Sequence, residues 1–272
     1  MSLFSSEDEA INWYDKQERV LTKDFLNTIP WQEVKQHKLE EQFFPVVMYM
    51  RDVERFTEIY YNELKLTPTG RDQHIRKFMD KWSQEEILHA ELLNRFLEEA
   101  GFPTDDKWFE KAKAKIPMKY KVNSKINSLA SNLFGKDFSA VHMTWGAINE
   151  LSTLNGYKRL WELAKHPVLE HILRGIAREE AVHSFFYWSL AKLKLEGSHF
   201  AQHITKYIIE HFWTPVGQGT KPAEEANYVI KTLFSGAEGL SIMSNHVNNR
   251  VAQLPGLSQL TKVTDRVAAA QP

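Results

Sequence analysis

The chain has 272 residues, a formal net charge of −1 and no cysteine. This length is enough for one large core, so we expect a single domain over residues 1–272. The balanced charge argues against nucleic-acid binding, and the lack of cysteine excludes disulfides, thiolate metal sites and iron–sulfur clusters. The N-terminus lacks an apolar signal core, and the longest apolar run, residues 43–50, is too short to span a bilayer. We therefore expect a cytoplasmic protein without a transmembrane segment.

Helical patterns fill the first part of the chain. A serine followed by acidic residues predicts a helix start near Ser5, with helical periodicity continuing to Phe25 before Pro30 interrupts it. A short charged helix is expected over residues 31–41. Two long helices are then predicted, over about 45–64 and about 72–100.

The rest of the chain is also predicted to be helical. Residues 104–135 are rich in lysine and asparagine, and we expect a crossover there with a short helix near 107–115. Further helices are predicted over the ranges 136–165, 167–197, 198–213, 222–234 and 237–254. The tail from Val267 is expected to be frayed. Because no alternating strand pattern occurs, the predicted fold class is all-α.

Two of the predicted long helices carry the motif Glu-x-x-His, as Glu86/His89 and Glu180/His183. Residues three apart lie on one face of a helix, so the carboxylate and the imidazole of each pair can hold the same ion. A third copy, at residues 196–199, contains a helix-breaking glycine and is set aside. The two remaining pairs are candidate metal ligands.

Each Glu-x-x-His helix follows a helix with one further carboxylate. Glu54 precedes Glu86 by 32 residues, and Glu150 precedes Glu180 by 30. The chain therefore reads as one helical hairpin used twice, with a site between the two copies. Four carboxylates and two histidines form the two-metal site of ferritin-like bundles. We expect such a four-helix bundle over about 45–195, with added N-terminal helices and a C-terminal helical extension over about 198–265.

The sequence neighbours of each acidic residue indicate whether it is a metal ligand or a surface group. The four candidate acids have mainly apolar or small neighbours one turn away, and a buried carboxylate is costly unless it binds a cation or a partner. The acids expected to form surface ion pairs instead are Glu58, Glu85, Glu91 and Glu179. Because Glu58 follows Glu54 by one turn, the choice between them as the first ligand is open.

Oxygen and imidazole ligands suit two iron ions, with manganese possible in place of one or both. The other histidines and aromatic residues receive structural interpretations. Four histidines are expected at the surface or at helix ends: His74, His142, His166 and His171. Four aromatic residues are expected to pack in the core rather than carry electrons: Trp82, Trp145, Tyr157 and Tyr187.

Residues 85–97 read Glu-Glu-Ile-Leu-His-Ala-Glu-Leu-Leu-Asn-Arg-Phe-Leu, which resembles a helix of the soluble acyl-acyl carrier protein desaturases. That helix has Glu-Glu-x-x-His followed by Leu-Leu-Asn. Residues 149–153, Asn-Glu-Leu-Ser-Thr, are similar to the family's Gln-Glu-x-x-Thr, and residues 178–183 to its Asp-Glu-x-x-His. The likeness covers roughly residues 45–195. The Glu54–Glu86 spacing is shorter than in the plant enzymes, and residues 213–217 have no counterpart in the family.

The resemblance implies an O₂-dependent di-iron oxidoreductase of fatty acid metabolism that introduces a double bond into an acyl chain. The six ligands would be Glu54, Glu86, His89, Glu150, Glu180 and His183. Thr153, one turn from Glu150, would assist oxygen activation. The resemblance also implies an acyl carrier protein or another acyl carrier, a ferredoxin-like electron donor and a homodimer.

Two other functions stay open. The same site could catalyse hydroxylation, N-oxygenation or aldehyde cleavage. It could also serve as a ferroxidase in an iron-storage cage, although 272 residues with C-terminal helices are many for such a subunit. A monomer or dimer in solution would be incompatible with a cage.

A basic run lies in the predicted crossover. Between Lys107 and Lys125 there are seven lysines and one acidic residue, Glu110. One interpretation is a solvated connection. The other is a docking surface for acyl carrier protein, because its acidic helices would be attracted to this run.

Overall fold

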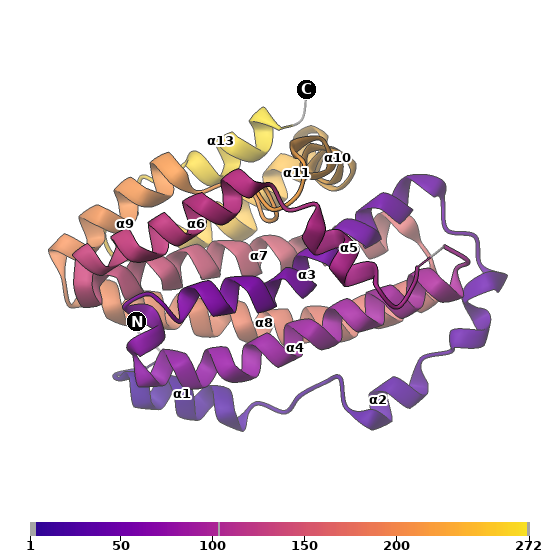
Figure 1. Cartoon of the computed structure of the whole chain (residues 1–272), viewed down its shortest axis with the longest axis horizontal. Coiled ribbons are helices and arrows are strands. Elements are labelled where there is room, and N and C mark those ends of the chain that lie inside the picture. The colour runs from indigo at the N-terminus through magenta and orange to yellow at the C-terminus, as the bar shows by residue number, and fades with distance from the viewer. Residues whose placement is uncertain (1–3, 103, 271–272) are drawn as a thin grey trace.

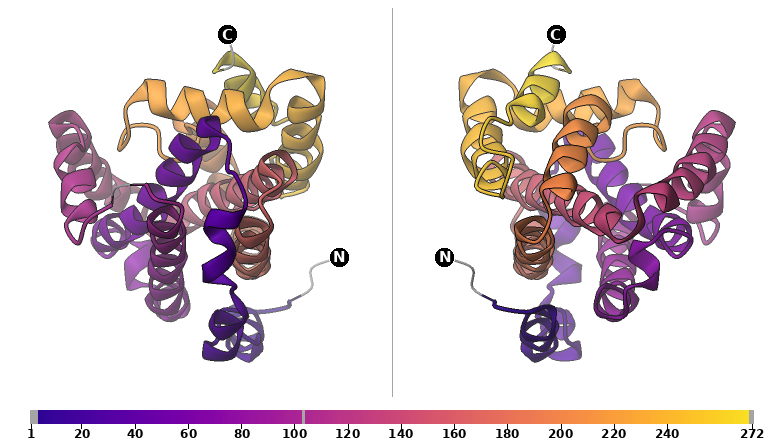
Figure 2. Two further views of the ribbon diagram at one scale, coloured as in Figure 1. Left: turned by 90° about the vertical axis from the view of Figure 1, so that its right-hand side faces the viewer. Right: turned by 90° about the vertical axis from the view of Figure 1, so that its left-hand side faces the viewer.

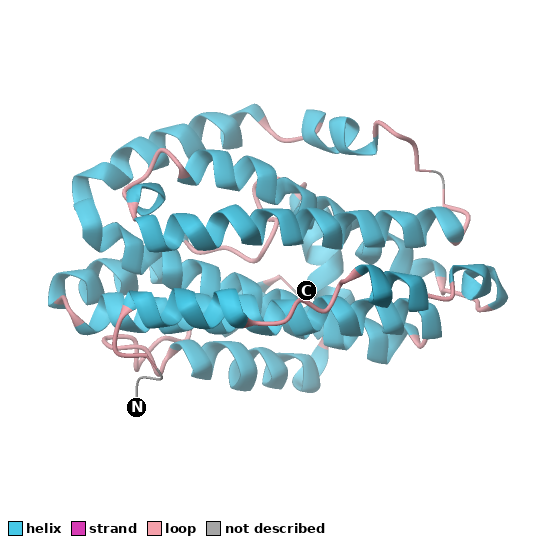
Figure 3. Ribbon diagram, turned by 90° about the horizontal axis from the view of Figure 1, so that it is seen from below, coloured by secondary structure: helices cyan, strands magenta, loops and turns pink. Residues whose placement is uncertain are grey.

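The computed structural model describes residues 4–102 and 104–270. Within these ranges every regular element is a helix, and an isolated bridge between Gln218 and Lys221 is the only β-type pairing (Figures 1 and 3). The predicted all-α fold class is therefore confirmed. No helix within the same ranges combines the length and the apolar character needed to cross a lipid bilayer.

The longest helices of the described chain lie side by side along the long axis of the molecule (Figure 1). They are α3 (Phe44–Leu64), α4 (Gln73–Glu99), α7 (Phe138–Ala164) and α8 (Pro167–Glu196). Helix α3 packs along α4, α7 packs along α8, and α4 also contacts α8. These helices closely follow the ranges predicted from the sequence.

Polar caps fix where two of these helices begin. The Asp72 carboxylate accepts hydrogen bonds from the backbone N–H groups of His74 and Ile75, at 3.0 and 3.2 Å, at the start of α4. At the start of α8, His166 Nδ1 accepts from the N–H of Leu169 at 3.2 Å. Because side chains repeat every three to four residues along a helix, the position of the first turn decides which later residues face inward.

An aromatic layer packs between α4, α8 and the N-terminal helix α1 (Glu7–Lys16). The ring of Phe78 stacks on Phe186 with centroids 4.1 Å apart, and Tyr14 meets Phe78 edge-on at 4.8 Å. All three side chains are fully buried. Burying each contributes about 1.5–3 kcal/mol to stability, so this layer anchors α1 on the long helices.

The N-terminal segment differs from the prediction. Helical periodicity was expected to run on to Phe25, but α1 ends at Lys16 and α2 spans Lys23–Thr28. The backbone N–H groups of Val20 and Leu21 instead donate to the Glu179 carboxylate, each at 3.0 Å. A continuous helix would use those N–H groups internally. The region expected as a charged helix forms short 3₁₀ segments over Trp31–Gln36 and Glu41–Phe43.

The crossover contains two helices rather than one. Helix α5 (Trp108–Ala114) corresponds to the predicted short helix, and α6 (Met118–Ala130) was not predicted. A 3₁₀ segment over Ser131–Asp137 then leads into α7. Figure 2 shows α6 at the edge of the molecule, set apart from the four long helices.

The C-terminal helices cover one side of α7. They are α9 (His199–Phe212), α10 (Ala223–Phe234), α11 (Gly236–Ile242), a π-helical turn (Met243–Asn248), α12 (Asn249–Val251) and α13 (Lys262–Ala269). The expectation of a frayed tail is wrong for Val267, which lies in α13 and is 2% exposed. The apolar side chain of Val267 packs in the core. The last two residues of the tail, 271–272, lie outside the described residues.

Candidate metal centre

The six residues predicted as ligands converge between the four long helices. Helix α3 supplies Glu54, α4 supplies Glu86 and His89, α7 supplies Glu150, and α8 supplies Glu180 and His183. Each of them is at most 6% exposed. A group of buried acids of this kind is costly to assemble without a cation.

The donor atoms fall into two overlapping groups. The first contains Glu54, Glu86, His89 and Glu180, and the second contains Glu86, Glu150, Glu180 and His183. Within each group one ligand atom per residue lies within 4.8 Å of all the others. Since Glu86 and Glu180 belong to both groups, the arrangement could hold two cations, and these two carboxylates are available to both.

The inward-facing atoms lack other partners. His89 Nδ1 lies 3.1 Å from a Glu180 oxygen, and His183 Nδ1 lies 3.0 Å from a Glu86 oxygen. Five buried atoms of the cluster have no hydrogen-bond partner: the two Nδ1 atoms, both carboxylate oxygens of Glu180 and one carboxylate oxygen of Glu86. Buried polar atoms are normally satisfied. A bound cation would satisfy all of these atoms at once, so the residues fit a metal.

The outward-facing histidine nitrogens each meet a further carboxylate. His89 Nε2 lies 3.1 Å from Glu179, and His183 Nε2 lies 2.7 Å from Glu85. Such contacts hold the ring orientation and keep the proton on Nε2, which leaves Nδ1 available for a metal. The prediction of a surface ion pair is therefore wrong for Glu179, which is buried, and only partly right for Glu85, which pairs with Arg19 but is half-buried and also contacts His183. A signal was present, because both motifs read Glu-Glu-x-x-His.

The N-terminal segment completes this outer layer. Besides His183, Glu85 accepts hydrogen bonds from Tyr14 at 2.7 Å and from Arg19. Burial acts to raise the pKa of Glu85, but the hydrogen bond and charge of His183, the Tyr14 hydrogen bond and the Arg19 charge lower that pKa to about 2. Glu85 thus stays ionised and can stabilise a proton on His183 Nε2.

Glu54, and not Glu58, belongs to the cluster. Glu54 is 4% exposed and accepts a hydrogen bond from the Tyr157 hydroxyl. The Glu58 carboxylate instead pairs with Arg55, and its side chain is 43% exposed. This places Glu58 at the surface, as one interpretation of the sequence expected.

Three of the four aromatic residues expected in the core are buried around the ligands. Trp82 Nε1 donates to Glu150 at 3.1 Å and Tyr157 donates to Glu54, so these two also orient carboxylates. The Tyr187 ring packs against α7 at Gly146, where an added Cβ would lie 2.3 Å from the ring. The fourth, Trp145, is only half-buried and lines a cavity.

A cavity of about 1060 Å³ lies directly beside the cluster. Its wall includes Glu54, Glu86, Glu150 and Thr153, together with residues of α6, α7 and α9. Apolar side chains form much of the remaining wall: Val53, Phe138, Val141, Trp145, Ile204, Ile208 and Val216. A largely apolar molecule could therefore lie against the candidate ligands.

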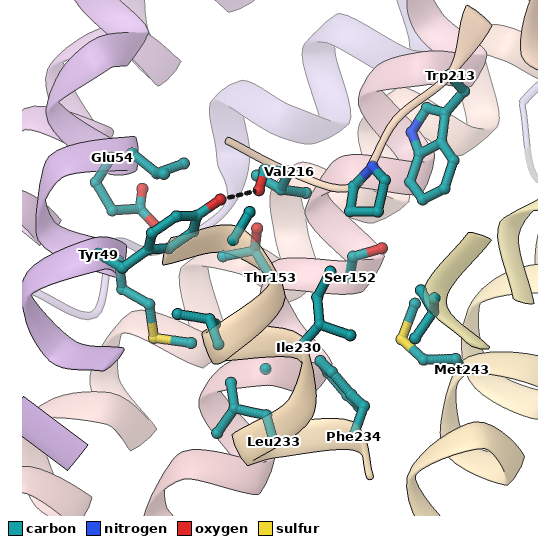
Figure 4. Close-up of a pocket in the computed structure, with 17 residues that line it drawn as sticks. Tyr49, Glu54, Ser152, Thr153, Trp213, Val216, Ile230, Leu233, Phe234 and Met243 are labelled. Carbon is teal, nitrogen blue, oxygen red and sulfur yellow. Dashed lines mark hydrogen bonds between the residues drawn. The ribbon is translucent and has the colours of Figure 1, made fainter. Parts of the chain in front are cut away.

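Thr153 lies between this cavity and a smaller one. The smaller cavity, of about 80 Å³, is lined by Glu54, Thr153 and apolar side chains that include Trp213 and Met243 (Figure 4). Thr153 is half-buried and borders both spaces. Thr153 thus borders the same space as Glu54 and Glu150.

The expectation for His142 is met only in part. The residue is half-buried and lies near the start of α7, but it also lines the large cavity. Burial lowers the pKa of His142 to about 4, and its Nδ1 has no hydrogen-bond partner. The neutral imidazole can therefore form a hydrogen bond with a polar group inside the cavity. The helix-end or surface interpretation holds for the others: His166 caps α8, His74 contacts Asp8 at 2.9 Å, and His171 stacks on Phe25.

The pKa values of several cluster residues are shifted so that they hold protons. Burial acts to lower the pKa of His183, but its contacts with Glu180 and Glu85 raise that pKa to about 10. His89 follows the same pattern through Glu179 and Glu180. Burial, reinforced by the Glu180 charge, raises the pKa of Glu86 well above its usual range. A cation that binds these atoms must displace protons from them.

We therefore expect metal loading to release protons. The apparent metal affinity should rise as the pH increases from 6 towards about 10, the pKa of His183, because fewer protons then have to be displaced. Titration calorimetry with Fe(II) under anaerobic conditions, in buffers of different ionisation enthalpy, measures the number released. Equal binding enthalpies in all buffers would contradict this prediction.

Comparison of the sequence with models of known protein families finds no match, and neither does comparison with curated proteins. The buried glutamate–histidine groups could bind metal, and the case for what they do rests on the geometry above.

Proposed function

We propose that this protein is an O₂-dependent di-iron oxidoreductase that introduces a double bond into an acyl chain, as acyl-acyl carrier protein desaturases do. The observation that carries the proposal is the pair of ligand groups sharing Glu86 and Glu180, beside a large and mostly apolar cavity. Carboxylate and imidazole donors without thiolate suit iron, and manganese would also fit. When bound, two iron ions would supply the activation of O₂.

The proposed reaction requires two electrons from an external donor. Two hydrogens leave neighbouring carbons of the chain, and a ferredoxin-like protein supplies two electrons while solvent supplies two protons. O₂ is reduced to two waters, and the carbon–carbon bond becomes double. The residues of this chain hold the metals, orient the two histidines and keep the acyl chain beside the ligands.

The cavity favours a substrate longer than a small metabolite. Ordinary small-molecule pockets occupy about 300–1,000 Å³, and this cavity, at about 1060 Å³, is slightly larger. Its apolar walls would exclude water from the reacting carbons. The proposed partners are an acyl carrier protein, a ferredoxin-like donor and a second copy of the chain.

The lysines of α5 support carrier docking less than their number in the sequence indicates. Lys111 pairs with Asp105, and Lys113 lies 2.9 Å from Glu110. These two lysines are therefore partly neutralised by neighbours. The carrier can be identified by comparing carrier-bound, coenzyme A-bound and free acyl substrates.

The proposal is tested by loading the protein anaerobically with Fe(II), then supplying O₂, a ferredoxin with its reductase, and each form of substrate. We expect two irons per chain and a product lighter by two hydrogens. A product that has gained oxygen would identify a hydroxylase or another oxygenase. Iron binding without any change in substrate, in an assembly of many subunits, would identify a ferroxidase.

Hydroxylation or N-oxygenation is the second candidate, and His142 favours it. The neutral His142 imidazole, whose Nδ1 has no hydrogen-bond partner, lines the same cavity as Asn149 and Thr57. Together they could bind a polar substrate group that a plain acyl chain lacks. Mass analysis of the product separates the two candidates.

Thr153→Val should preserve iron loading but lower product formation. The substitution removes the hydroxyl at nearly constant volume, and Thr153 is outside both ligand groups. If the hydroxyl assists oxygen activation, product per O₂ consumed should fall by about tenfold or more and hydrogen peroxide should rise. Oxygen uptake and product are measured together, and Ser152→Ala serves as the neighbouring control. Unchanged coupling would assign Thr153 to packing.

A further inference from the structure

Helix α6 has its two faces in the reverse of the usual orientation. An amphipathic helix on a protein surface normally turns its apolar face to the core. In α6 the side facing α3 and the cavity carries Tyr120, Ser124 and Ser128, and Ser131 continues this face into the 3₁₀ segment. Ser128 and Ser131 are buried, and Ser124 donates a hydrogen bond to Glu63.

The opposite side of α6 is apolar and faces outward. We call it the α6 stripe. Its residues, spaced by three or four, are Met118, Val122, Ile126 and Leu129 of α6 and Leu133 of the 3₁₀ segment that follows. Each is between 50% and 87% exposed. A continuous apolar row on an isolated surface helix is costly in water and marks an interaction surface. Something outside the described chain is needed to cover it.

The charges beside the stripe identify the kind of partner. Helix α6 carries Lys119, Lys121 and Lys125 and no acidic residue. At about 100° per residue, Lys119 falls on one side of the stripe, and Lys121 and Lys125 fall on the other. A second copy pairing α6 with α6 would bring these lysines together and repel. The partner is therefore apolar where it meets the stripe and negatively charged on both sides of it.

An anionic phospholipid surface has both properties. Basic side chains border the apolar face of helices that lie in the plane of a membrane, where the apolar side chains enter the acyl region and the lysines meet the headgroups. Helix α6 also lies at the edge of the molecule (Figure 2), and its stripe side chains are exposed. A lipid layer accepts such side chains without a matching groove. A folded acidic protein would need such a groove.

The position of the cavity agrees with this partner. Helices α6 and α9 both contribute to its wall, and two aromatic residues of α9, Tyr207 and Phe212, line it while remaining 57% and 59% exposed. Tyrosine, with its polar hydroxyl on an apolar ring, is enriched where membrane meets water. We propose that α6 docks the protein on an anionic phospholipid surface through the α6 stripe and its flanking lysines, with the cavity rim beside the lipid. This inference does not depend on the bound metal or on the reaction.

The test is flotation of the full-length protein with vesicles of phosphatidylcholine plus phosphatidylglycerol, compared with phosphatidylcholine alone. We expect binding to the anionic vesicles, weakened by salt and at least about tenfold weaker for neutral ones. The double variant Ile126→Asn/Leu129→Asn should lose binding to the anionic vesicles. The triple variant Lys119→Gln/Lys121→Gln/Lys125→Gln should lose it as well. The controls are Tyr228→Asn, at an exposed aromatic residue of α10, and Lys16→Gln/Lys23→Gln/Lys35→Gln.

A labelled variant reports the docked face directly. Because the chain has no cysteine, Ile126→Cys can carry a single environment-sensitive dye, with Lys23→Cys as its control. The dye at position 126 should shift to the blue on anionic vesicles, and the control dye should not. Three results would overturn the proposal: no binding to anionic vesicles, a stripe variant that only turns a dimer into a monomer, or a shift caused by acidic carrier protein but not by lipid.

Discussion

Glu86→Ala and Glu180→Ala should each abolish metal binding at both positions of the candidate centre, whereas Glu54→Ala and Glu150→Ala should each remove only one metal. The reason is that Glu86 and Glu180 belong to both ligand groups, while Glu54 and Glu150 belong to one group each. Metal content per chain, measured by mass spectrometry after anaerobic Fe(II) loading and desalting, would fall to none or to half. Helical content should be kept, because each change removes a carboxyl group that is costly to bury.

The matched control is Glu58→Ala, on the same helix as Glu54 and one turn further along. Its carboxylate pairs with Arg55 outside the cluster, so this variant should load as the wild type does. Normal loading by Glu54→Ala together with loss in Glu58→Ala would show that the ligand is Glu58. A single tightly bound metal in the wild type would refute the two-metal arrangement.

Glu179→Gln should weaken metal binding by about 10–100-fold, or about 1.4–2.7 kcal/mol, without removing any ligand. The glutamine amide can donate to His89 Nε2, where the carboxylate can only accept. The imidazole proton is then driven to Nδ1, the nitrogen that faces the cluster. Glu85→Gln should act in the same way on His183, which lies 2.7 Å away.

Competition with a chelator measures these affinities, and Glu91→Gln is the control. Glu91 lies on α4 as Glu85 does, but it is exposed. Circular dichroism should show the same helical content for all three variants. Wild-type affinity in both Glu85→Gln and Glu179→Gln would mean that these carboxylates do not orient the histidines.

Helical periodicity was sufficient to find the cluster because ligands on one helix must share a face. Glu86 and His89 could be paired from spacing alone, and Glu54 and Glu150 followed from the repeated hairpin. Glu179 was misassigned because it lies beside that face, in a position that is exposed on a helix considered alone. What buries it is the backbone at Val20 and Leu21, far away in sequence.

The orientation of α6 escaped prediction for a related reason. Periodicity identifies an apolar face but assumes that the core lies against it, and here Ser128 is buried while Ile126 is exposed. The size of the cavity is equally a property of several elements, because its wall draws on α3, α6, α7 and α9. Neither feature is encoded in any single segment.

The contacts of Tyr14, Arg19 and the Val20–Leu21 backbone with Glu85 and Glu179 also set an order of assembly. The residues around Val20 leave the ribosome before α8 does, yet Glu179, one of their two acceptors, lies on α8 and is 159 residues later in the chain. This segment therefore reaches its final place only after that part of α8 has been synthesised. The two carboxylates that orient His89 and His183 thus gain their contacts with the segment late in synthesis.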